Sequence, residues 1–218
     1  MKNHSLKVEI SLFLVVLFSL ILPSFLTYLS ADTGKLFTQW NFPVNQACLA
    51  FISFFLFLFY NDNNEKPHLL PFPVFLSVGF LFFTALIIKF FSVILKQVSP
   101  VSVKIPDNFT AWLFCILTFA FAAVSEEIIY RFYFVDKFYS LLKHIFKNEN
   151  SQRPFVLYFC ELTGCLLFAF AHLYLGWLAV LNAFVAHIVL RGAYKKNKCL
   201  FPCIISHFIY NIISLILL

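Results

Sequence analysis

Two adjacent glutamates, Glu126 and Glu127, lie inside one of the most apolar stretches of this chain. A carboxylate at the centre of a membrane helix costs roughly 2.5–3.5 kcal/mol on insertion scales, so such residues persist where they form ion pairs, face water or carry chemistry. Arg131 follows Glu127 by four residues and shares its helical face, whereas Glu126 points about 100° away. We therefore expect Arg131 to neutralise Glu127, and Glu126 to act as a general base on water. The competing interpretation is that both acids only join helices through ion pairs.

Two histidines and one asparagine follow in later apolar runs, at spacings that place pairs of side chains on one helical face. Phe168 and His172 are four residues apart, and so are His207 and Asn211. An imidazole assists proton transfer, and an imidazole beside a carboxamide donates hydrogen bonds to a developing oxyanion. The simpler alternative for each histidine is a hydrogen-bonded residue of an apolar core.

Other polar side chains in these runs are assigned no part in the chemistry. Cys199, Cys203 and His207 share one helical face, but a tetrahedral zinc site prefers ligands from several elements, so we expect no metal site there. His187 lies near the basic end of its apolar run, and Glu161 lies near the start of its own. Both are expected at the membrane interface.

The composition identifies the elements that must position these side chains. The chain has 218 residues, of which 61% are hydrophobic, 12% are charged and 32 are phenylalanines, with a mean hydropathy of +0.88. A water-soluble fold of this size could not bury so much apolar surface. We therefore predict an all-α, polytopic membrane protein that forms one integral membrane domain in the lipid bilayer. The basic residues behind its net charge of +6 lie in short segments between apolar runs, so no nucleic-acid partner is expected.

Hydropathy divides the chain into about seven segments of bilayer-crossing length. Proline-containing and polar clusters separate them, and these belong outside the hydrocarbon. The predicted spans are Val8–Ser30, Val44–Tyr60, Phe72–Leu95, Phe109–Val135, Phe155–Leu173, Trp177–Leu190 and Leu200–Leu218. The first is longer than the core of a cleavable signal peptide, about 7–15 residues, so we expect it to remain as a transmembrane helix.

Lysine and arginine are distributed unequally between the two sides that this division defines. With a cytoplasmic N-terminus and seven crossings, eleven lie on the cytoplasmic side and three on the other. The cytoplasmic set is Lys2, Lys7, Lys66, Lys137, Lys143, Lys147, Arg153, Arg191, Lys195, Lys196 and Lys198. The opposite set is Lys35, Lys96 and Lys104. The positive-inside rule then favours a cytoplasmic N-terminus and a C-terminus outside.

Glu-Glu-x3-Arg, Phe-x3-His and His-x3-Asn occur in this order on three separate predicted spans. This ordered set resembles the CPBP family, which comprises the CAAX prenyl endopeptidases and their bacterial relatives linked to bacteriocin processing and self-immunity (also called Abi proteins). The family pattern EExxxR, FxxxH and HxxxN/D is matched without substitution. The matching residues are Glu126, Glu127, Arg131, Phe168, His172, His207 and Asn211. The resemblance begins near Ala111, so we divide the chain into N-terminal transmembrane helices over 1–108 and a catalytic helical core over 109–218.

The resemblance implies a glutamate-dependent intramembrane endopeptidase in a bacterial inner (cell) membrane, acting on a membrane-associated peptide or protein. The first glutamate of the family motif activates water, and this corresponds to Glu126. The second, Glu127, supports the site. His172 would work with Glu126 on the water, while His207 and Asn211 would stabilise the oxyanion.

The resemblance leaves other readings open. Arg131 and Phe168 are assigned supporting positions, and no cofactor is expected. A glutamate with two histidines also suits zinc, so a zinc-dependent membrane protease is one alternative. A second is a non-catalytic immunity or regulatory protein of the same fold. A third, a transporter with a proton relay, is disfavoured because the chain has no internal repeat.

The depths of the three motifs in the membrane conflict with the predicted spans. At 1.5 Å per residue, Glu126 lies about 15 Å and His207 about 10 Å from the cytoplasmic end of its span, but His172 lies about 25 Å from that end. We therefore expect the residues before Glu161 to form an interfacial helix, which would bring His172 to about 15 Å. The active-site cavity is expected to open toward the cytoplasmic half.

Overall fold

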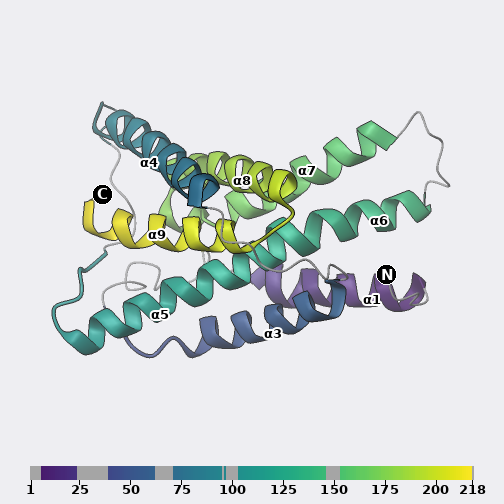
Figure 1. Ribbon diagram of the computed structural model, residues 1–218, viewed down its shortest axis with the longest axis horizontal. Coiled ribbons are helices and arrows are strands. Elements are labelled where there is room, and N and C mark those ends of the chain that lie inside the picture. The colour runs from purple at the N-terminus through teal and green to yellow at the C-terminus, as the bar shows by residue number, and fades with distance from the viewer. Residues whose placement is uncertain are drawn as a thin grey trace.

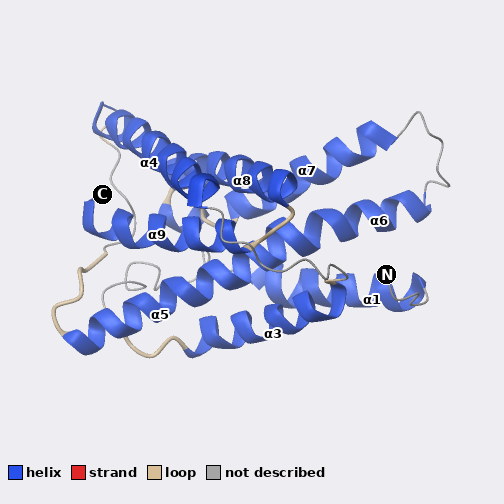
Figure 2. Ribbon diagram, in the orientation of Figure 1, coloured by secondary structure: helices blue, strands red, loops and turns tan. Residues whose placement is uncertain are grey.

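Helices account for nearly all of the structure. The computed structural model describes residues 6–23, 39–61, 71–94, 96, 103–145 and 153–217. Figure 2 shows these residues as helices joined by short loops. Their bounds are α1 Leu6–Val16, η1 Leu17–Ile21, α3 Val44–Tyr60, α4 Pro71–Ile94, α5 Phe109–Glu126, η4 Glu127–Phe134, α6 Val135–Ile145, α7 Arg153–Phe170, η6 Leu173–Leu175, α8 Trp177–Asn197 and α9 Phe201–Leu217.

The length and composition of the helices fit a bilayer. In the described part of the chain, three helices are long and apolar enough to cross a membrane: Phe72–Ile94, Phe109–His144 and Trp177–Asn197. Three further apolar helices are shorter: Val44–Tyr60, Pro154–Phe170 and Phe201–Ile216. The chain is therefore a polytopic helical membrane bundle, as predicted, while the count of seven spans stays a prediction. The C-terminal part of the first predicted span, Val8–Ser30, lies outside the described residues.

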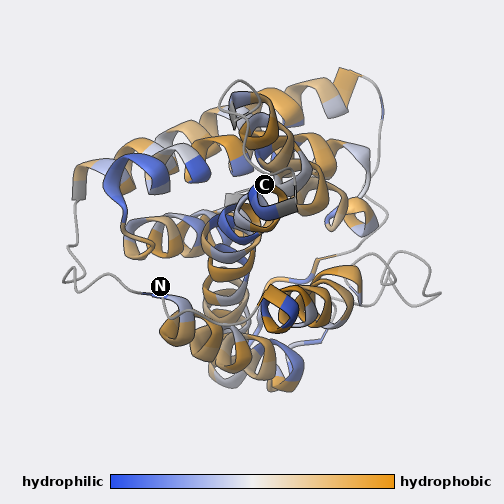
Figure 3. Ribbon diagram, turned by 90° about the vertical axis from the view of Figure 1, so that its right-hand side faces the viewer, coloured by the Kyte–Doolittle hydropathy of each residue, from blue (hydrophilic) through white to orange (hydrophobic). Residues whose placement is uncertain are grey.

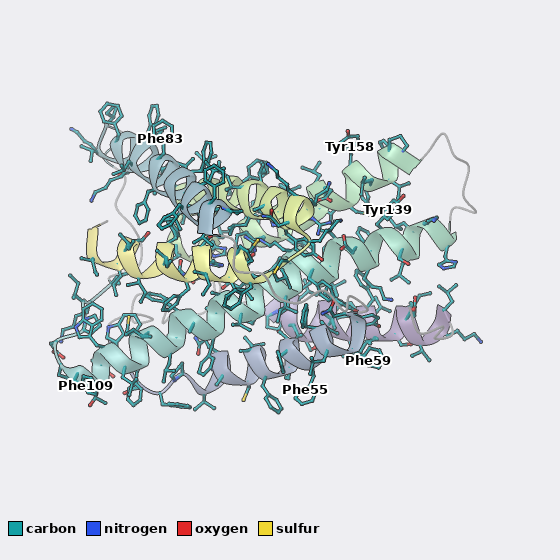
Figure 4. The ribbon with its side chains drawn as sticks, in the orientation of Figure 1. Phe55, Phe59, Phe83, Phe109, Tyr139 and Tyr158 are labelled. Atoms are coloured by element: carbon teal, nitrogen blue, oxygen red, sulfur yellow. The ribbon has the colours of Figure 1, made fainter. Side chains whose placement is uncertain are left out.

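Large apolar side chains cover the outside of the bundle. Phe83 is 62% exposed and Phe109 is 83% exposed, and Figure 4 shows both projecting away from the helices, as does Tyr158 on α7. The end-on view of Figure 3 shows hydrophobic residues on most of the outward-facing ribbon. In water such a surface would drive aggregation, whereas lipid chains solvate it.

One long helix organises the bundle. The elements α5, η4 and α6 follow one another without a break and cross the whole view in Figure 1. α9 and α3 pack against α5, and α7 packs against α6. α4 packs against both α8 and α9, so the N-terminal helices surround the part of the chain that carries the three motifs. α5 begins at Asn108, whose side-chain oxygen accepts a hydrogen bond from the backbone N–H of Ala111, as an N-cap does.

The predicted end of this helix is wrong. Hydropathy placed the end of this span at Val135, but the helix continues to Ile145. Lys137 is 5% exposed and forms an ion pair of 3.2 Å with Glu9 of α1, and its ammonium lies 4.3 Å from the ring centroid of Tyr60. These partners from distant parts of the chain satisfy the charge inside the protein, so it does not end the helix.

The expected interfacial helix before Glu161 is also absent from the described residues. α7 is one continuous helix from Arg153 to Phe170. α6 and α7 pack against each other, and both reach the right-hand side of Figure 1, as α1 does. His172 follows the end of this continuous helix by two residues.

Candidate active site

Three helices bring one carboxylate and two imidazoles together. Glu126 is the last residue of α5, His172 lies in the turn after α7, and His207 lies in the second turn of α9. Glu126 Oε2 is 3.9 Å from His172 Nε2 and 3.9 Å from His207 Nε2. These separations are too long for direct hydrogen bonds, and a water molecule between the groups could bond to them. Oε2 is buried and has no hydrogen-bond partner in the described structure.

The other ring nitrogen of each histidine is fixed by a hydrogen bond. His172 Nδ1 is 2.9 Å from the carbonyl oxygen of Phe168, one turn earlier in the chain. His207 Nδ1 is 2.8 Å from Glu127 Oε1. Because a carbonyl or carboxylate oxygen only accepts, Nδ1–H donates in both rings. Each Nε2 is therefore left to face Glu126.

Glu127 and Arg131 form the predicted ion pair. Arg131 Nε lies 3.3 Å from Glu127 Oε2, and both side chains are completely buried. Glu127 also accepts the bond from His207, so one carboxylate is shared between a guanidinium and an imidazole. Nη1 and Nη2 of Arg131 make no hydrogen bond to any described residue; the guanidinium carbon lies 3.7 Å from the ring centroid of Phe168, as in a cation–π contact.

The Phe168 ring is a platform for the site. It is 2% exposed, and its centroid lies 4.7 Å from the His172 ring and 6.5 Å from the His207 ring. His187 packs 5.7 Å from the same ring and is 2% exposed, so its predicted place at the membrane interface is wrong. Neither ring nitrogen of His187 has a hydrogen-bond partner in the described structure. The partners of the Phe168 ring come from η4, α8 and α9, so spacing in the sequence does not predict these contacts.

Asn211 shares a cavity with the histidines. The cavity has a volume of about 730 Å³ and is lined by His172, His207 and Asn211 together with Arg131 and Phe168. The structure thus brings Glu126, His172 and His207 into one cluster and places Asn211 on the wall beside it. No direct contact joins Asn211 to the cluster among the described interactions.

The cavity extends toward the C-terminal end of α9. Its lining includes Val103 and Ile105, which precede α5, and Leu215 and Ile216 near the end of α9. These residues belong to the end of the bundle opposite the basic loops, at the left of Figure 1. The expected opening toward the cytoplasmic half stays a prediction, and it requires this end of the bundle, rather than the basic end, to face the cytoplasm.

A basic residue that the sequence analysis did not assign to the site holds the segment that carries the glutamates. η4 is a π-helix, a distortion that is frequent at functional sites. Arg191 Nη1 of α8 donates to the backbone carbonyl of Arg131 within it. Arg191 also bonds Asp136 at 2.6 Å and Glu161 at 3.0 Å, and Lys195 bonds Glu161 at 3.3 Å. Glu161 therefore forms ion pairs with Arg191 and Lys195 between helices, rather than being an acid that faces the membrane interface alone.

The residues at the site do not have the spacing of a preformed zinc centre. Ligands at 2.0–2.2 Å from a tetrahedral zinc lie roughly 3.3–3.5 Å from one another, which is less than the 3.9 Å between Glu126 Oε2 and each Nε2. Among the described residues, no group of three or more histidine, cysteine, aspartate or glutamate side chains is arranged to hold a metal. Cys203 Sγ instead donates to the carbonyl of Leu190 at 3.4 Å. We derive no step through a metal.

A comparison with protein-family models finds a match that covers the residues of the site. Residues 108–213 match the model described as "Type II CAAX prenyl endopeptidase Rce1-like". Neither the curated proteins nor the solved structures contain a match to the chain. The matched segment begins at the N-cap of α5 and ends within α9, and it includes Glu126, His172 and His207 with their partners. Over this segment, the chain is similar to the Rce1-like type II CAAX prenyl endopeptidases.

Proposed function

We propose that the chain is a glutamate-dependent intramembrane endopeptidase that cleaves a membrane-associated peptide or protein. One observation carries this proposal. A carboxylate oxygen of Glu126 lies 3.9 Å from Nε2 of both His172 and His207, and the two histidines line a cavity inside an apolar bundle. Similarity to the Rce1-like family model supports a CAAX-protease type of enzyme.

The hydrogen bonds of the site suggest how water would be activated. A water molecule bonded to Glu126 and to the free Nε2 of His172 would be oriented for attack. Glu126 takes a proton as the water oxygen bonds to the carbonyl carbon of the scissile peptide. It then returns that proton to the nitrogen of the leaving amine as the C–N bond breaks. The two products are a carboxylic acid and an amine, and no covalent enzyme intermediate forms.

His207 is suited to stabilise the oxyanion of the tetrahedral intermediate. Because its Nδ1–H donates to Glu127, its Nε2 donates a hydrogen bond only when the ring is an imidazolium. The Glu127 carboxylate stabilises that cation. Asn211 would add an amide N–H from the same face of α9.

The surroundings of the enzyme are part of the same proposal. We infer about seven crossings of a bacterial inner membrane, with the N-terminus in the cytoplasm and the C-terminus outside, from the eleven-to-three distribution of basic residues. The substrate would be a lipidated C-terminus or a bacteriocin-like precursor. No nucleic-acid partner and no cofactor are proposed.

The direct test is a cleavage assay of purified protein, in proteoliposomes, against a library of membrane peptides. Glu126→Gln keeps the shape of the side chain but removes the base, so the rate should fall by about 10²–10⁴-fold. Asp107→Asn, at an exposed carboxylate before α5, is the matched control and should cleave as the wild type does. The thermal unfolding midpoint of Glu126→Gln should stay within a few degrees of the wild type.

The same assay distinguishes the alternatives. Loss of activity with both the substitution and a chelator would replace the metal-free mechanism by a zinc-dependent one. Absence of cleavage, together with a biological effect that survives Glu126→Gln, would identify a non-catalytic immunity or regulatory protein. Ion flux in liposomes without cleavage would identify a transporter.

A further inference from the structure

Beyond Asn211, the cavity wall carries polar atoms that the proposed reaction does not use. Asn182 of α8 donates from Nδ2 to the hydroxyl of Tyr210 of α9 at 2.7 Å. Asn182 Oδ1 and Ser214 Oγ are both buried, and neither has a hydrogen-bond partner among the residues that the structure describes. Asn182, Tyr210 and Ser214 all line the cavity. We call these three residues the polar ledge.

The rest of the wall cannot satisfy the ledge. Around it the cavity is lined by apolar side chains, namely Leu81, Phe119, Leu175, Ala179 and Leu215. A buried polar atom without a partner destabilises a fold, so each such atom in a native protein needs an explanation. The Tyr210 hydroxyl accepts the bond from Asn182, which leaves its own proton available. The ledge therefore offers one acceptor, Asn182 Oδ1, and two hydroxyl donors to whatever enters the cavity.

The position of the ledge relative to the reacting groups suggests the shape of its ligand. His207, Asn211 and Ser214 are spaced at i, i+4 and i+7, so they share one face of α9. Ser214 lies about 10 Å along the helix axis from His207. An extended peptide advances about 3.3 Å per residue, so that distance corresponds to about three residues. An extended chain also presents N–H and C=O groups alternately, which matches a wall that has both an acceptor and donors.

We propose that the polar ledge binds the main chain of an extended peptide substrate, about three residues from the scissile bond on one side. Asn182 Oδ1 accepts from a peptide N–H, and the Ser214 and Tyr210 hydroxyls donate to peptide carbonyls. This inference rests on the proposed function, since the ligand is the substrate of the same site. It adds that the enzyme requires a minimum length of peptide main chain beyond the cleaved bond and accepts different side chains there.

Ser214→Ala gives the cleanest test, because the hydroxyl has no hydrogen-bond partner among the described residues. Its removal should leave the thermal unfolding midpoint unchanged or raised, while KM for a cleaved peptide increases about 5–10-fold, the value of one hydrogen bond. Asn182→Leu should raise KM similarly. Ser92→Ala is the matched control: its hydroxyl donates to the carbonyl of Lys89 in its own helix, away from the cavity lining, and KM should not change.

Changes in the peptide identify the contact itself. Peptides are shortened one residue at a time from each end. With the wild type, kcat/KM should fall when fewer than three residues remain on one side, and Ser214→Ala should be insensitive to that third residue. Methylation of the peptide nitrogen that faces Asn182 should weaken binding to the wild type by the same factor as Asn182→Leu, and the two changes together should not add.

Binding measured separately from cleavage keeps this inference distinct from the proposed function. The affinity of fluorescent peptides is measured with Glu126→Gln protein, with and without the ledge substitutions. Equal affinity and equal KM in all ledge variants would overturn the ledge and leave the protease intact. Length-dependent binding without cleavage by the wild type would overturn the protease and leave the ledge. No binding by any of the proteins would overturn both.

Discussion

Glu127 has two nitrogen partners, and they separate its structural from its functional contribution. Its carboxylate lies 3.3 Å from Arg131 Nε and 2.8 Å from His207 Nδ1, with the side chain fully buried. The bond to Arg131 neutralises a charge inside the bundle. The bond to His207 fixes the ring and favours the imidazolium that an oxyanion requires.

We predict that Glu127→Gln destabilises the protein and inactivates it for two different reasons. It leaves the Arg131 guanidinium buried without a counter-charge, which costs about 3–5 kcal/mol. The double variant Glu127→Gln/Arg131→Met removes both charges and should recover most of the lost thermal stability in detergent. It should not recover kcat, because His207 still lacks its carboxylate. Recovery of both properties would show that Glu127 acts only as the partner of Arg131.

Sequence spacing predicted the ion pair between Glu127 and Arg131 but missed the contact between His187 and Phe168. Glu127 and Arg131 are four residues apart, so the ion pair follows from helical geometry alone. His187 was expected at the interface, yet it is buried against Phe168. The contact between His187 and Phe168 depends on how α7 and α8 pack, which no local pattern encodes.

At the scale of elements, the π-helix η4 is joined to three helices through Arg191. This side chain of α8 donates to the carbonyl of Arg131 in η4, and it pairs with Asp136 of α6 and Glu161 of α7. A guanidinium has five N–H donors in a fixed plane, whereas an ammonium is a point charge that cannot meet these acceptors in the same geometry. Arg191 is therefore a positioning residue for the glutamates just before and at the start of η4.

We predict that Arg191→Lys lowers kcat at least tenfold with little change in KM, because the substrate-binding wall is intact while Glu126 and Glu127 lose their alignment. Steady-state kinetics on a cleaved peptide measure the two constants separately. Lys195→Met is the matched control. Lys195 pairs with the same Glu161 but is 48% exposed, so its loss should cost less than about 1 kcal/mol and leave kcat unchanged. Equal effects of the two substitutions would refute a positioning role.

The helices were predictable to the extent that their ends are set locally. α3 has the predicted bounds, Val44–Tyr60, since its apolar run is flanked by Pro43 and by a polar segment that begins at Asn61. The end of α6 was not predictable from the chain, because Lys137 is neutralised by Glu9, which lies in α1. The π-helical register of η4 was likewise missed, since the residues Glu127–Phe134 carry no spacing that differs from an α-helix.

At the scale of the whole molecule, charge and cavity lie at opposite ends. The cavity extends to Ile105 and Ile216. The other end carries basic residues of α6, of the C-terminal part of α8 and of the loop after it, namely Lys137, Lys143, Arg191, Lys195, Lys196 and Lys198. If the basic end faces the cytoplasm, as the positive-inside rule favours, then the active site receives its substrate from the outer side of the membrane. The orientation of the bundle thus decides on which side of the membrane cleavage occurs.

We predict that a cysteine at the cavity end reacts with a membrane-impermeant thiol reagent in intact cells, while one at the basic end does not. Ile216→Cys tests the cavity end, since Ile216 lines the cavity and is 53% exposed, and Lys196→Cys tests the exposed basic end of α8. Both are made in a Cys48→Ser background, because Cys48 is the exposed native thiol, and that background alone gives the reference labelling of the remaining cysteines. Labelling of Lys196→Cys should appear only after the cells are permeabilised. The reverse pattern would invert the bundle and place the cavity on the cytoplasmic side. In either orientation, slower labelling of Ile216→Cys in the presence of bound peptide would show that substrate enters at this end.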